Sequence, residues 1–552
     1  MAFPLSPGVT VSEVDLTTVV PSVATTVGGF AGEFTWGPVE EITSVSSEVR
    51  LTSLFGEPND TNFGHFFTAA NFLSYGTDLR LVRAANNTCY NARSNSSAAV
   101  VQIKNGTDYL QNFSDGTNTN QWVAKYPGSY GNNVAVSIAD SNTFTGWAFA
   151  SGFTSAPATS TYASGLNGSN DEIHIVVYDA STSANTILEK YAFVSKASDA
   201  KNSDGSSNYY KEVINRKSGF VWWTKHPTQG TNWGSTATST SFTLLASSLN
   251  YVLAGGTDVS PTTGDLQRAF DLFENEDAVD ISFLMTGPNG TTVSSYVISI
   301  CETRKDCIAF VSPAKNDVVD DVGSEANNII TTRNSLTSSS FAFMDSGWKY
   351  QYDKYSDVYR WVPLNGDIAG ICSRSDQTRD PWYSPAGLNR GILRNVVKLA
   401  WNPTKAERDT LYAKGINPVV SFPGEGTMLY GDKTLLSRPS AFDRINVRRL
   451  FIVLQKAISR AARSSLFEFN DEFTRASFVG LVEPFLRDVQ GRRGITDFRV
   501  VCDESNNTAE VIDRNEFVGD IYVKPARSIN FIQLNFVAVR TGVRFDEIVG
   551  QF

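Results

Sequence analysis

The chain has 552 residues, of which 41% are hydrophobic and 19% are charged, the balance of an ordinary globular protein with about two to four domains. Its 57 acidic residues outnumber its 47 basic residues, and the resulting net charge of −10 argues against non-specific nucleic-acid binding by the whole molecule. No apolar run approaches the roughly 20 residues of a membrane span, and no secretory signal opens the chain. We therefore expect no membrane insertion.

The residue types that carry metal and catalytic chemistry are sparse. The three histidines, His65, His174 and His226, lie far apart in the sequence, which argues against a multi-histidine metal site or a histidine-based triad. The five cysteines are odd in number and lack the two-residue spacing of a zinc or redox site, so free thiols in a reducing compartment are the simple account. We expect no metal, no cofactor and no enzymatic activity.

The front of the chain begins with an extended, proline-punctuated arm over residues 1–22. Residues 23–88 are expected to form a compact α/β piece. Apolar side chains at helical spacing predict a helix over 63–75, and Gly76-Thr77-Asp78 then turns into a strand over 79–84. The composition changes at about residue 90.

Residues 90–255 are rich in Ser, Thr, Asn, Gly and aromatic residues. Short alternating runs over 134–138, 172–178 and 220–224 lie between Gly/Asn/Ser turns, which is typical of short β-strands. This segment is therefore expected to form a β-rich inserted outer domain.

Residues 256–362 are expected to form an α/β middle domain. Helices alternate there with hydrophobic strands, a pattern that predicts a small parallel sheet. The expected elements are a helix over 265–274, a strand over 279–285, a helix over 293–303 and a strand over 307–311. An aromatic, loop-like segment over 341–361 leads into the last body domain.

The clearest predicted helix begins at Val447. Its apolar residues fall within about 100° of one another on a helical wheel. The opposite side carries a stripe of cations, Arg449, Lys456, Arg460 and Arg463. Two interpretations of this stripe remain open, a solvated helix face and a basic surface that docks an acidic partner.

A second helix is expected to start at Asn470-Asp471-Glu472 and to run to about Arg487, with a kink or break at Pro484. Strands are expected over 498–502 and 516–523. Residues 526–552 form a C-terminal arm, in which 529–540 alternates between apolar and polar residues like a half-buried strand.

Both ends of the chain therefore look like strands without partners. Unpaired strand edges recruit other chains, so the two arms are candidates for donation to neighbouring subunits. The alternative is that each arm adds to the chain's own sheet, as terminal strands often do.

Motifs of nucleotide binding and hydrolysis are incomplete. Residues 426–434 resemble a phosphate loop, but Asp432 stands where a lysine is needed, and a carboxylate repels phosphate. Gly28-Gly29-Phe30-Ala31-Gly32 lacks the dinucleotide spacing, and no Gly-x-Ser-x-Gly elbow is present. Asp317, Asp320 and Asp321 are most simply a solvated acidic loop.

Several segments, taken in order, resemble the contractile tail sheath proteins of T4-like bacteriophages. The resemblance covers residues 1–88 and about 363–552 well and is weak between about 140 and 250. The matching segments are LSPGV at 5–9, FTWGP at 34–38, LFG at 54–56, NFLSYGTDLR at 71–80, YPGSYGN at 126–132, GGTD at 255–258, GDIAG at 366–370, INP at 416–418, FPGEG at 422–426 and INVRRLF at 445–451, continuing through Thr541.

The resemblance implies an α+β multidomain fold, with an α/β inner core domain, strand-donating arms and β-rich inserted outer domains. The inner core would combine 23–88 with 363–525, discontinuously. The arms would add strands to the sheets of neighbouring subunits through Val9, Val11, Val14, Ile529, Phe531, Ile532, Leu534 and Phe536. A tube-facing helix would suit the basic stripe of Arg449, Lys456, Arg460 and Arg463.

The function implied by the resemblance is that of a structural subunit. Copies would stack as hexameric rings in a helical sleeve around the tail tube and contract to drive the tube through the host envelope. The partners would be the chain itself, the tail tube protein, and baseplate and neck or terminator proteins, with no direct nucleic-acid binding. The subunit would be assembled in the host bacterial cytoplasm and reside in the virion, or in a phage-derived bacterial particle.

The alternative function is a surface adhesin whose β-rich middle binds glycan. Trp222, Trp223 and Trp233 are the aromatic residues available for stacking on sugars, although core packing is the simpler role for most of them.

Overall fold

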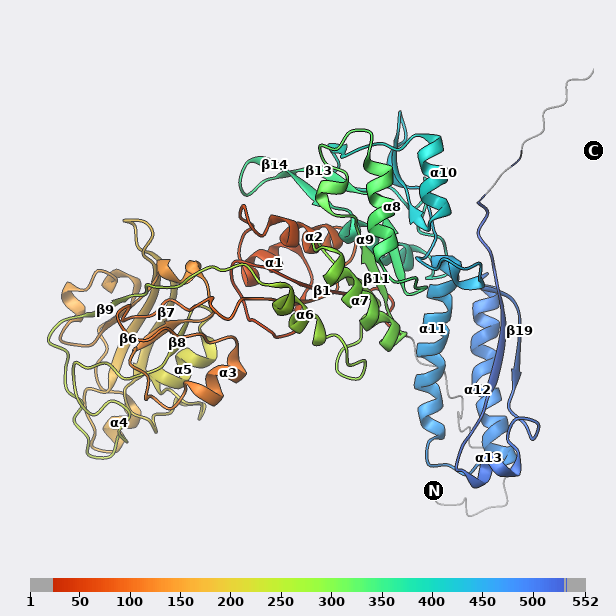
Figure 1. The fold of residues 1–552 in the computed structure, drawn as a ribbon. Helices are drawn as coiled ribbons and strands as arrows, with labels where there is room; N and C mark the ends of the chain where they lie inside the picture. The colour runs from red at the N-terminus through yellow and green to blue at the C-terminus, as the bar shows by residue number, and fades with distance from the viewer. Residues whose placement is uncertain (1–22, 531–532, 534–552) are drawn as a thin grey trace, which may run out of the picture. The chain divides into compact units, whose positions relative to one another are not determined.

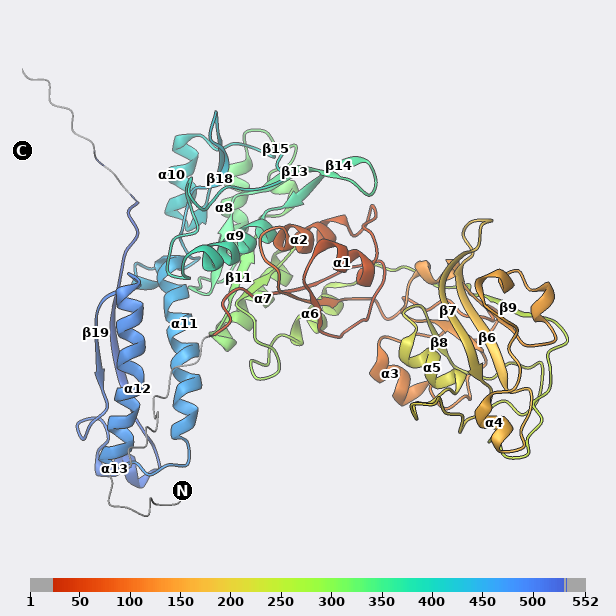
Figure 2. The same cartoon turned by 180° about the vertical axis from the view of Figure 1, so that it is seen from behind.

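The computed structural model describes residues 23–530 and 533 (Figures 1 and 2). The chain forms two compact units. The larger one runs to Pro381 and resumes over Pro385–Arg460, and the C-terminal one contains Trp382–Ser384 and the chain from Ala461. No helix in the described ranges is long and apolar enough to cross a membrane.

A seven-stranded sheet forms the centre of the larger unit, in the order β16-β12-β11-β10-β1-β3-β2. Neighbouring strands are parallel except for the edge strand β2, which is antiparallel to β3. The strands are β1 Gly28–Gly32, β2 Thr43–Val45, β3 Leu79–Arg83, β10 Phe283–Met285, β11 Ile308–Val311, β12 Ala342–Asp345 and β16 Ile416–Asn417.

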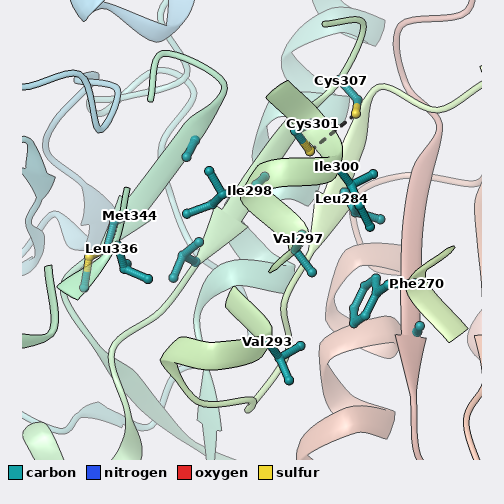
Figure 3. Packing of buried hydrophobic residues seen from close by; sticks show 14 of the residues in the cluster. Phe270, Leu284, Val293, Val297, Ile298, Ile300, Cys301, Cys307, Leu336 and Met344 are labelled. Carbon is teal, nitrogen blue, oxygen red and sulfur yellow. Dashed lines mark hydrogen bonds between the residues drawn. The ribbon is translucent and has the colours of Figure 1, made fainter. Parts of the chain in front are cut away.

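Helices cover both faces of this sheet, because the strands are apolar on both sides. One hydrophobic core lies under α6 and α7, and Figure 3 shows Phe270, Val293 and Val297 within it. The other core lies under α1, α2 and α9. The helices of the larger unit around the sheet are α1 Glu48–Phe55, α2 Phe63–Leu73, α6 Thr263–Asp271, α7 Thr291–Arg304, α8 Glu325–Ser335, α9 Asn365–Thr378, α10 Lys405–Ala413 and α11 Ile445–Ala462.

The sequence predicts two separate domains, an inner core over 23–88 with 363–525 and a middle domain over 256–362. The central sheet contains strands from both. Strand β1 pairs with β3 on one side and with β10 on the other. Strands of the front piece and of the expected middle domain therefore share one sheet. The expected inner core over 363–525 is itself divided, because the chain from Ala461, with Trp382–Ser384, forms the C-terminal unit. Sequence pattern does not encode which distant strands pair, which explains the difference.

Residues 90–255 contain two further sheets, both antiparallel. One has the order β7-β6-β5-β9 and the other pairs β4 with β8, and a separate hydrophobic core lies between them. The elements are α3 Gly106–Asn112, β4 Trp122–Ala124, β5 Val134–Ala139, α4 Thr161–Gly165, β6 Glu172–Asp179, β7 Thr186–Ser195, α5 Tyr210–Lys217, β8 Val221–Trp223 and β9 Leu249–Val252.

The aromatic segment expected to be a loop over 341–361 is instead mostly strand. It contains β12 and the hairpin of β13 Trp348–Asp353 and β14 Val358–Pro363, which β15 Lys398–Leu399 extends to three strands. The segment over 426–434 that resembles a phosphate loop begins instead with a strand, β18 Gly426–Leu429, which forms a hairpin with β17 Val419–Phe422. Asp432 forms an ion pair with Arg444 at 2.8 Å.

The C-terminal unit consists of α12 Glu472–Gly491, β19 Ile495–Val501, α13 Ala509–Asp513 and β20 Asp520–Pro525. The predicted helix start is confirmed, because the side chain of Asp471 accepts a hydrogen bond from the Thr474 amide at 2.8 Å. Helix α12 continues through Pro484 and ends four residues beyond the expected Arg487.

Candidate functional site

The C-terminal unit presents a β-hairpin backed by one helix. β19 and β20 pair antiparallel, with Phe498 opposite Val523 and Val500 opposite Ile521. Helix α12 packs against β19, and its buried residues include Phe478, Leu486 and Val489. The helix therefore covers one face of a sheet that has only two strands among the described residues.

The backbone edges of this hairpin are open in the described part of the chain. β19 pairs only with β20 there, so the outer edge of each strand has no ladder partner. A two-stranded hairpin is marginally stable in water, and open edges are where a further strand adds. The hairpin is consequently a candidate acceptor for strands from another chain.

The predicted strand-donating residues fall mostly outside the described ranges. Ile529 is the one that the structure describes, four residues after β20 ends at Pro525, and 82% of its surface is exposed. The others, Val9, Val11, Val14, Phe531, Ile532, Leu534 and Phe536, lie outside the described residues.

The basic stripe of α11 is largely neutralised within the chain. Arg449 is buried and donates hydrogen bonds to both carboxylate oxygens of Asp376, which lies on α9 and is itself fully buried. Burial raises the pKa of Asp376 to about 6, against the opposing effect of the Arg449 charge. The helical wheel suggested a surface position for Arg449, but the structure places its side chain inside the larger unit.

Two further cations of the stripe share one acidic partner. Lys456 Nζ lies 2.8 Å from Asp280 and donates to the carbonyl oxygen of Ile281 at 2.7 Å, and Arg460 also donates to Asp280. Burial alone would raise the pKa of Asp280, but the hydrogen bonds and charges of Lys456 and Arg460 lower it below its usual value. Lys456 is nearly buried, whereas the Arg460 side chain is 39% exposed.

Arg463 is exposed and begins a short 3-10 turn, Arg463–Ser465, at the start of the C-terminal unit. The surface part of the stripe thus consists of Arg460 and Arg463. Sequence reasoning missed the pairing of the other cations because Asp280 and Asp376 lie far away along the chain. No local pattern marks either acid as a partner.

The tryptophans considered for glycan stacking pack in the interior. Trp222 and Trp223 are 6% and 1% exposed, and the Trp222 ring stacks on Tyr109 at 4.2 Å while Lys125 lies over it at 3.2 Å. Trp233 is half-buried. Among the described residues, no group of three or more His, Cys, Asp and Glu side chains is arranged to hold a metal ion.

Three family models match the chain in order. They are the phage tail sheath protein Gp18 domain III N-terminal region over residues 25–84, the phage tail sheath protein central domain over 260–435, and the phage tail sheath C-terminal domain over 437–538. These three matches leave out residues 85–259, where the two antiparallel sheets with their own core lie.

Relatives match along the whole length. The tail sheath protein of Vibrio phage KVP40 is 34% identical over 99% of this chain and 100% of the relative. The tail sheath protein of Enterobacteria phage T4 is 35% identical over 99% of each chain. The crystal structure of the sheath tail protein of Listeria innocua has the same fold, with a TM-score of 0.53, 10% identity, and coverage of 92% of this chain and 96% of that one.

Two tail sheath proteins are thus more than 30% identical to this chain over 99% of its residues, and three sheath family models match it in order. The chain belongs to the family of contractile phage tail sheath proteins.

Proposed function

We propose that copies of this chain polymerise helically, as stacked hexameric rings, around a tail tube and contract to drive that tube through the host envelope. The observation that carries the proposal is the open-edged hairpin β19–β20 in the C-terminal unit, followed at once by a strand-like arm. A subunit with both a strand acceptor and a strand donor links to its neighbours without end.

The arms act as hinges in this proposal. Backbone pairing between an arm and a neighbour's hairpin is strong but local, so subunits keep their links while rotating as near-rigid bodies. The energy for contraction lies in contacts between subunits that are better satisfied in the contracted lattice and are held back by a kinetic barrier. The role is structural and not enzymatic.

The proposed partners are the chain itself, the tail tube protein, and baseplate and neck or terminator proteins. A solved structure of the same fold is titled as an anti-feeding prophage baseplate, with a TM-score of 0.51, which supports a subunit contact at the baseplate end. The exposed cations Arg460 on α11 and Arg463 in the 3-10 turn that follows are the proposed contribution to the tube contact, because a polar, salt-sensitive contact is breakable on contraction. The subunit would be assembled in the host bacterial cytoplasm and reside in the virion.

Electron microscopy of the purified chain tests the strand links. The full chain is compared with a copy lacking residues 1–20 and 529–552, and with two copies that each lack one arm. Long hollow tubes from the full chain and none from the doubly truncated chain support the proposal. The single-arm deletions show which arm is required.

A folding control is needed because truncation can disturb the hairpin. Circular dichroism and urea unfolding of the truncated chain should match the full chain, since one deletion ends before β1 begins at Gly28 and the other begins after β20 ends at Pro525. Monodisperse particles from the folded full chain and from every truncated chain would contradict the proposal and favour a discrete glycan-binding adhesin.

A further inference from the structure

Two of the five cysteines, Cys301 and Cys307, lie in direct contact inside the larger unit (Figure 3). The thiol of Cys307 donates a hydrogen bond to the sulfur of Cys301, and the two sulfur atoms are 3.4 Å apart. Both side chains are fully buried. Their spacing in the sequence matches no zinc or redox motif, so only the fold brings them together.

The other three cysteines have different surroundings. Cys89 and Cys502 donate to backbone carbonyl oxygens, at 2.9 Å and 3.5 Å. Cys372 is fully buried on α9. All five cysteines belong to the described residues, and only Cys301 and Cys307 have their sulfur atoms in contact. A buried cysteine often serves only as a small hydrophobic side chain, an account that suffices for Cys372 but leaves the contact of two thiols unused.

The ends of two elements hold the sulfur atoms in place. The amide of Lys305, which ends α7, donates to the carbonyl oxygen of Cys301 at 2.9 Å. Cys307 comes immediately before β11, and its neighbour Ile308 donates to a backbone carbonyl oxygen at 3.1 Å. Between them, the buried Arg304 donates to two further backbone carbonyl oxygens. The two thiols therefore face each other at a fixed separation, and groups held in this way react as if highly concentrated.

Bond formation between these sulfur atoms involves little movement. A disulfide bond is about 2.05 Å long, so the sulfur atoms have to approach by about 1.4 Å. Thr303 and Lys305, in the short stretch between the two cysteines, are exposed. The pair consequently lies beneath a single surface turn, and local opening of such a turn admits a small molecule.

We propose that Cys301 and Cys307 form a redox modification site, at which hydrogen peroxide converts the two thiols into a disulfide that ties α7 to β11. Hydrogen peroxide is uncharged and small, which suits a pair that is covered from solvent. The inference goes beyond the proposed function, because it concerns the single chain and holds whether or not copies of the chain polymerise.

The conversion balances with one molecule of peroxide. Burial, followed by the hydrogen bond from Cys307, raises the pKa of the Cys301 thiol, so Cys307 attacks first. Its sulfur takes one peroxide oxygen, the O–O bond breaks, and the released hydroxide leaves with the thiol proton as water. The Cys301 sulfur then attacks the resulting sulfenic acid, the S–S bond forms, the S–O bond breaks, and a second water leaves with the Cys301 proton. A small dithiol reverses the reaction by thiol–disulfide exchange.

Peptide mapping of the full, folded chain tests the assignment. Trypsin cleaves after Arg304 and Lys305, between the two cysteines, and releases 269–304 and 306–315 as separate fragments from the reduced chain. After treatment with hydrogen peroxide the two fragments should remain joined, and dithiothreitol should separate them. Neither fragment contains another cysteine. Circular dichroism before and after treatment verifies that the chain stays folded during the reaction.

Thiol counts in the denatured chain measure how selective the reaction is. The unmodified chain should fall from five free thiols to three, and dithiothreitol should restore five. The matched variants are C301A and C372A, each lacking one fully buried cysteine. C372A should still lose two thiols, whereas C301A should lose none that dithiothreitol restores.

Three results would overturn the assignment. Separate fragments with all five thiols retained would show that Cys301 and Cys307 serve core packing only. A loss that dithiothreitol does not reverse would show oxidation to sulfinic acid in place of a disulfide. An equal reversible loss in C301A would place the reaction at other cysteines.

The effect of the tie is measured by unfolding. α7 packs against β11, and a bond across their ends restricts the unfolded chain, so the oxidised chain should have a higher urea midpoint than the reduced chain. C301A treated with peroxide in the same way should show no shift. An unchanged or lower midpoint for the oxidised chain would contradict a stabilising tie between α7 and β11.

Discussion

Arg449 on α11 and Asp376 on α9 form a buried ion pair in which the guanidinium contacts both carboxylate oxygens. The Arg449 side chain is 4% exposed and that of Asp376 is 0% exposed. A cation that a helical wheel places opposite the apolar stripe thus joins two helices inside the larger unit. Charge reversal there acts on the fold before it acts on any partner.

Replacement of Arg449 by Met should destabilise the larger unit by about 3–5 kcal/mol, because Asp376 is left buried without its partner. The double variant R449M/D376L should recover much of that loss, since it leaves no unpaired charge. Urea unfolding followed by tryptophan fluorescence measures both. Equal stabilities of R449M and R449M/D376L would show that the pair is not coupled.

Charge reversal at the surface cations Arg460 and Arg463 should affect assembly and not folding, in contrast to a change at the buried Arg449. R460E/R463E should change the free energy of unfolding by less than about 1 kcal/mol, because the Arg460 pair with Asp280 is partly exposed. The variant should nevertheless weaken assembly on purified tubes, most strongly at low salt. The matched control is R514E, another exposed arginine, paired with Glu516. Salt-independent assembly identical to that of R514E would contradict a tube contact at these residues.

Asp345 makes the stability of the larger unit depend on pH. Its carboxyl group accepts hydrogen bonds from the Gly347 amide at 2.9 Å and from Ser312 at 2.7 Å, and burial followed by the charge of Asp367 raises its pKa to about 8. Because the pKa of Asp345 is higher in the folded state, its protonated carboxyl group stabilises the fold. This contribution is fully present below the unfolded pKa of about 3.9 and is lost as the pH rises to about 8.

The free energy of unfolding of D345N, measured relative to that of the unmodified chain, should therefore rise by roughly 1.4 kcal/mol per pH unit between pH 5 and pH 8. The comparison of the two proteins at each pH cancels the other titrating groups, including Lys349 and Asp367, which face the same interior. Urea midpoints at pH 5, 6.5 and 8 give the difference. A constant difference across this range would show that Asp345 keeps an ordinary pKa.

Replacement of two helical glycines by alanine should change the free energy of unfolding in opposite directions. A Cβ atom at Gly366 on α9 would lie 2.4 Å from the Thr68 carbonyl oxygen on α2, so G366A should destabilise by about 1–3 kcal/mol. At Gly480 on α12 a Cβ atom meets nothing within 4 Å, so G480A should stabilise by about 0.5–1 kcal/mol. Urea unfolding separates the two signs, and stabilisation by G366A would show that α2 and α9 move apart readily.

Local patterns predicted many elements correctly. The strand expected over 79–84 is β3, the strand over 307–311 contains β11, and the long helix at Val447 is α11. Each of these depends on a period within one segment, which the sequence displays directly. The start of α12 was predicted closely because Asp471 caps it, whereas its end lies four residues beyond the expected Arg487.

Features that depend on distant partners were not predictable. The loop expected over 341–361 is mostly strand, because Lys349, Gln351 and Asp353 on the buried face of β13 have polar partners that come from other elements of the fold. The exposure of the α11 cations was misjudged because Asp280 and Asp376 come from other elements. The pairing of β1 with β10 joins segments that the sequence separates by the whole inserted region.

The position of β1 in the central sheet also bears on how the protein is made. Gly28 pairs with Leu79 soon after both emerge from the ribosome, but its second neighbour, Phe283, is translated only after the inserted sheets are complete. β16 follows later still, at Ile416. The central sheet closes late, and the hairpin β19–β20 and the arm beyond it are translated last. A nascent chain therefore lacks the acceptor hairpin and the C-terminal arm, two of the proposed means of joining a polymer, until its body has been synthesised.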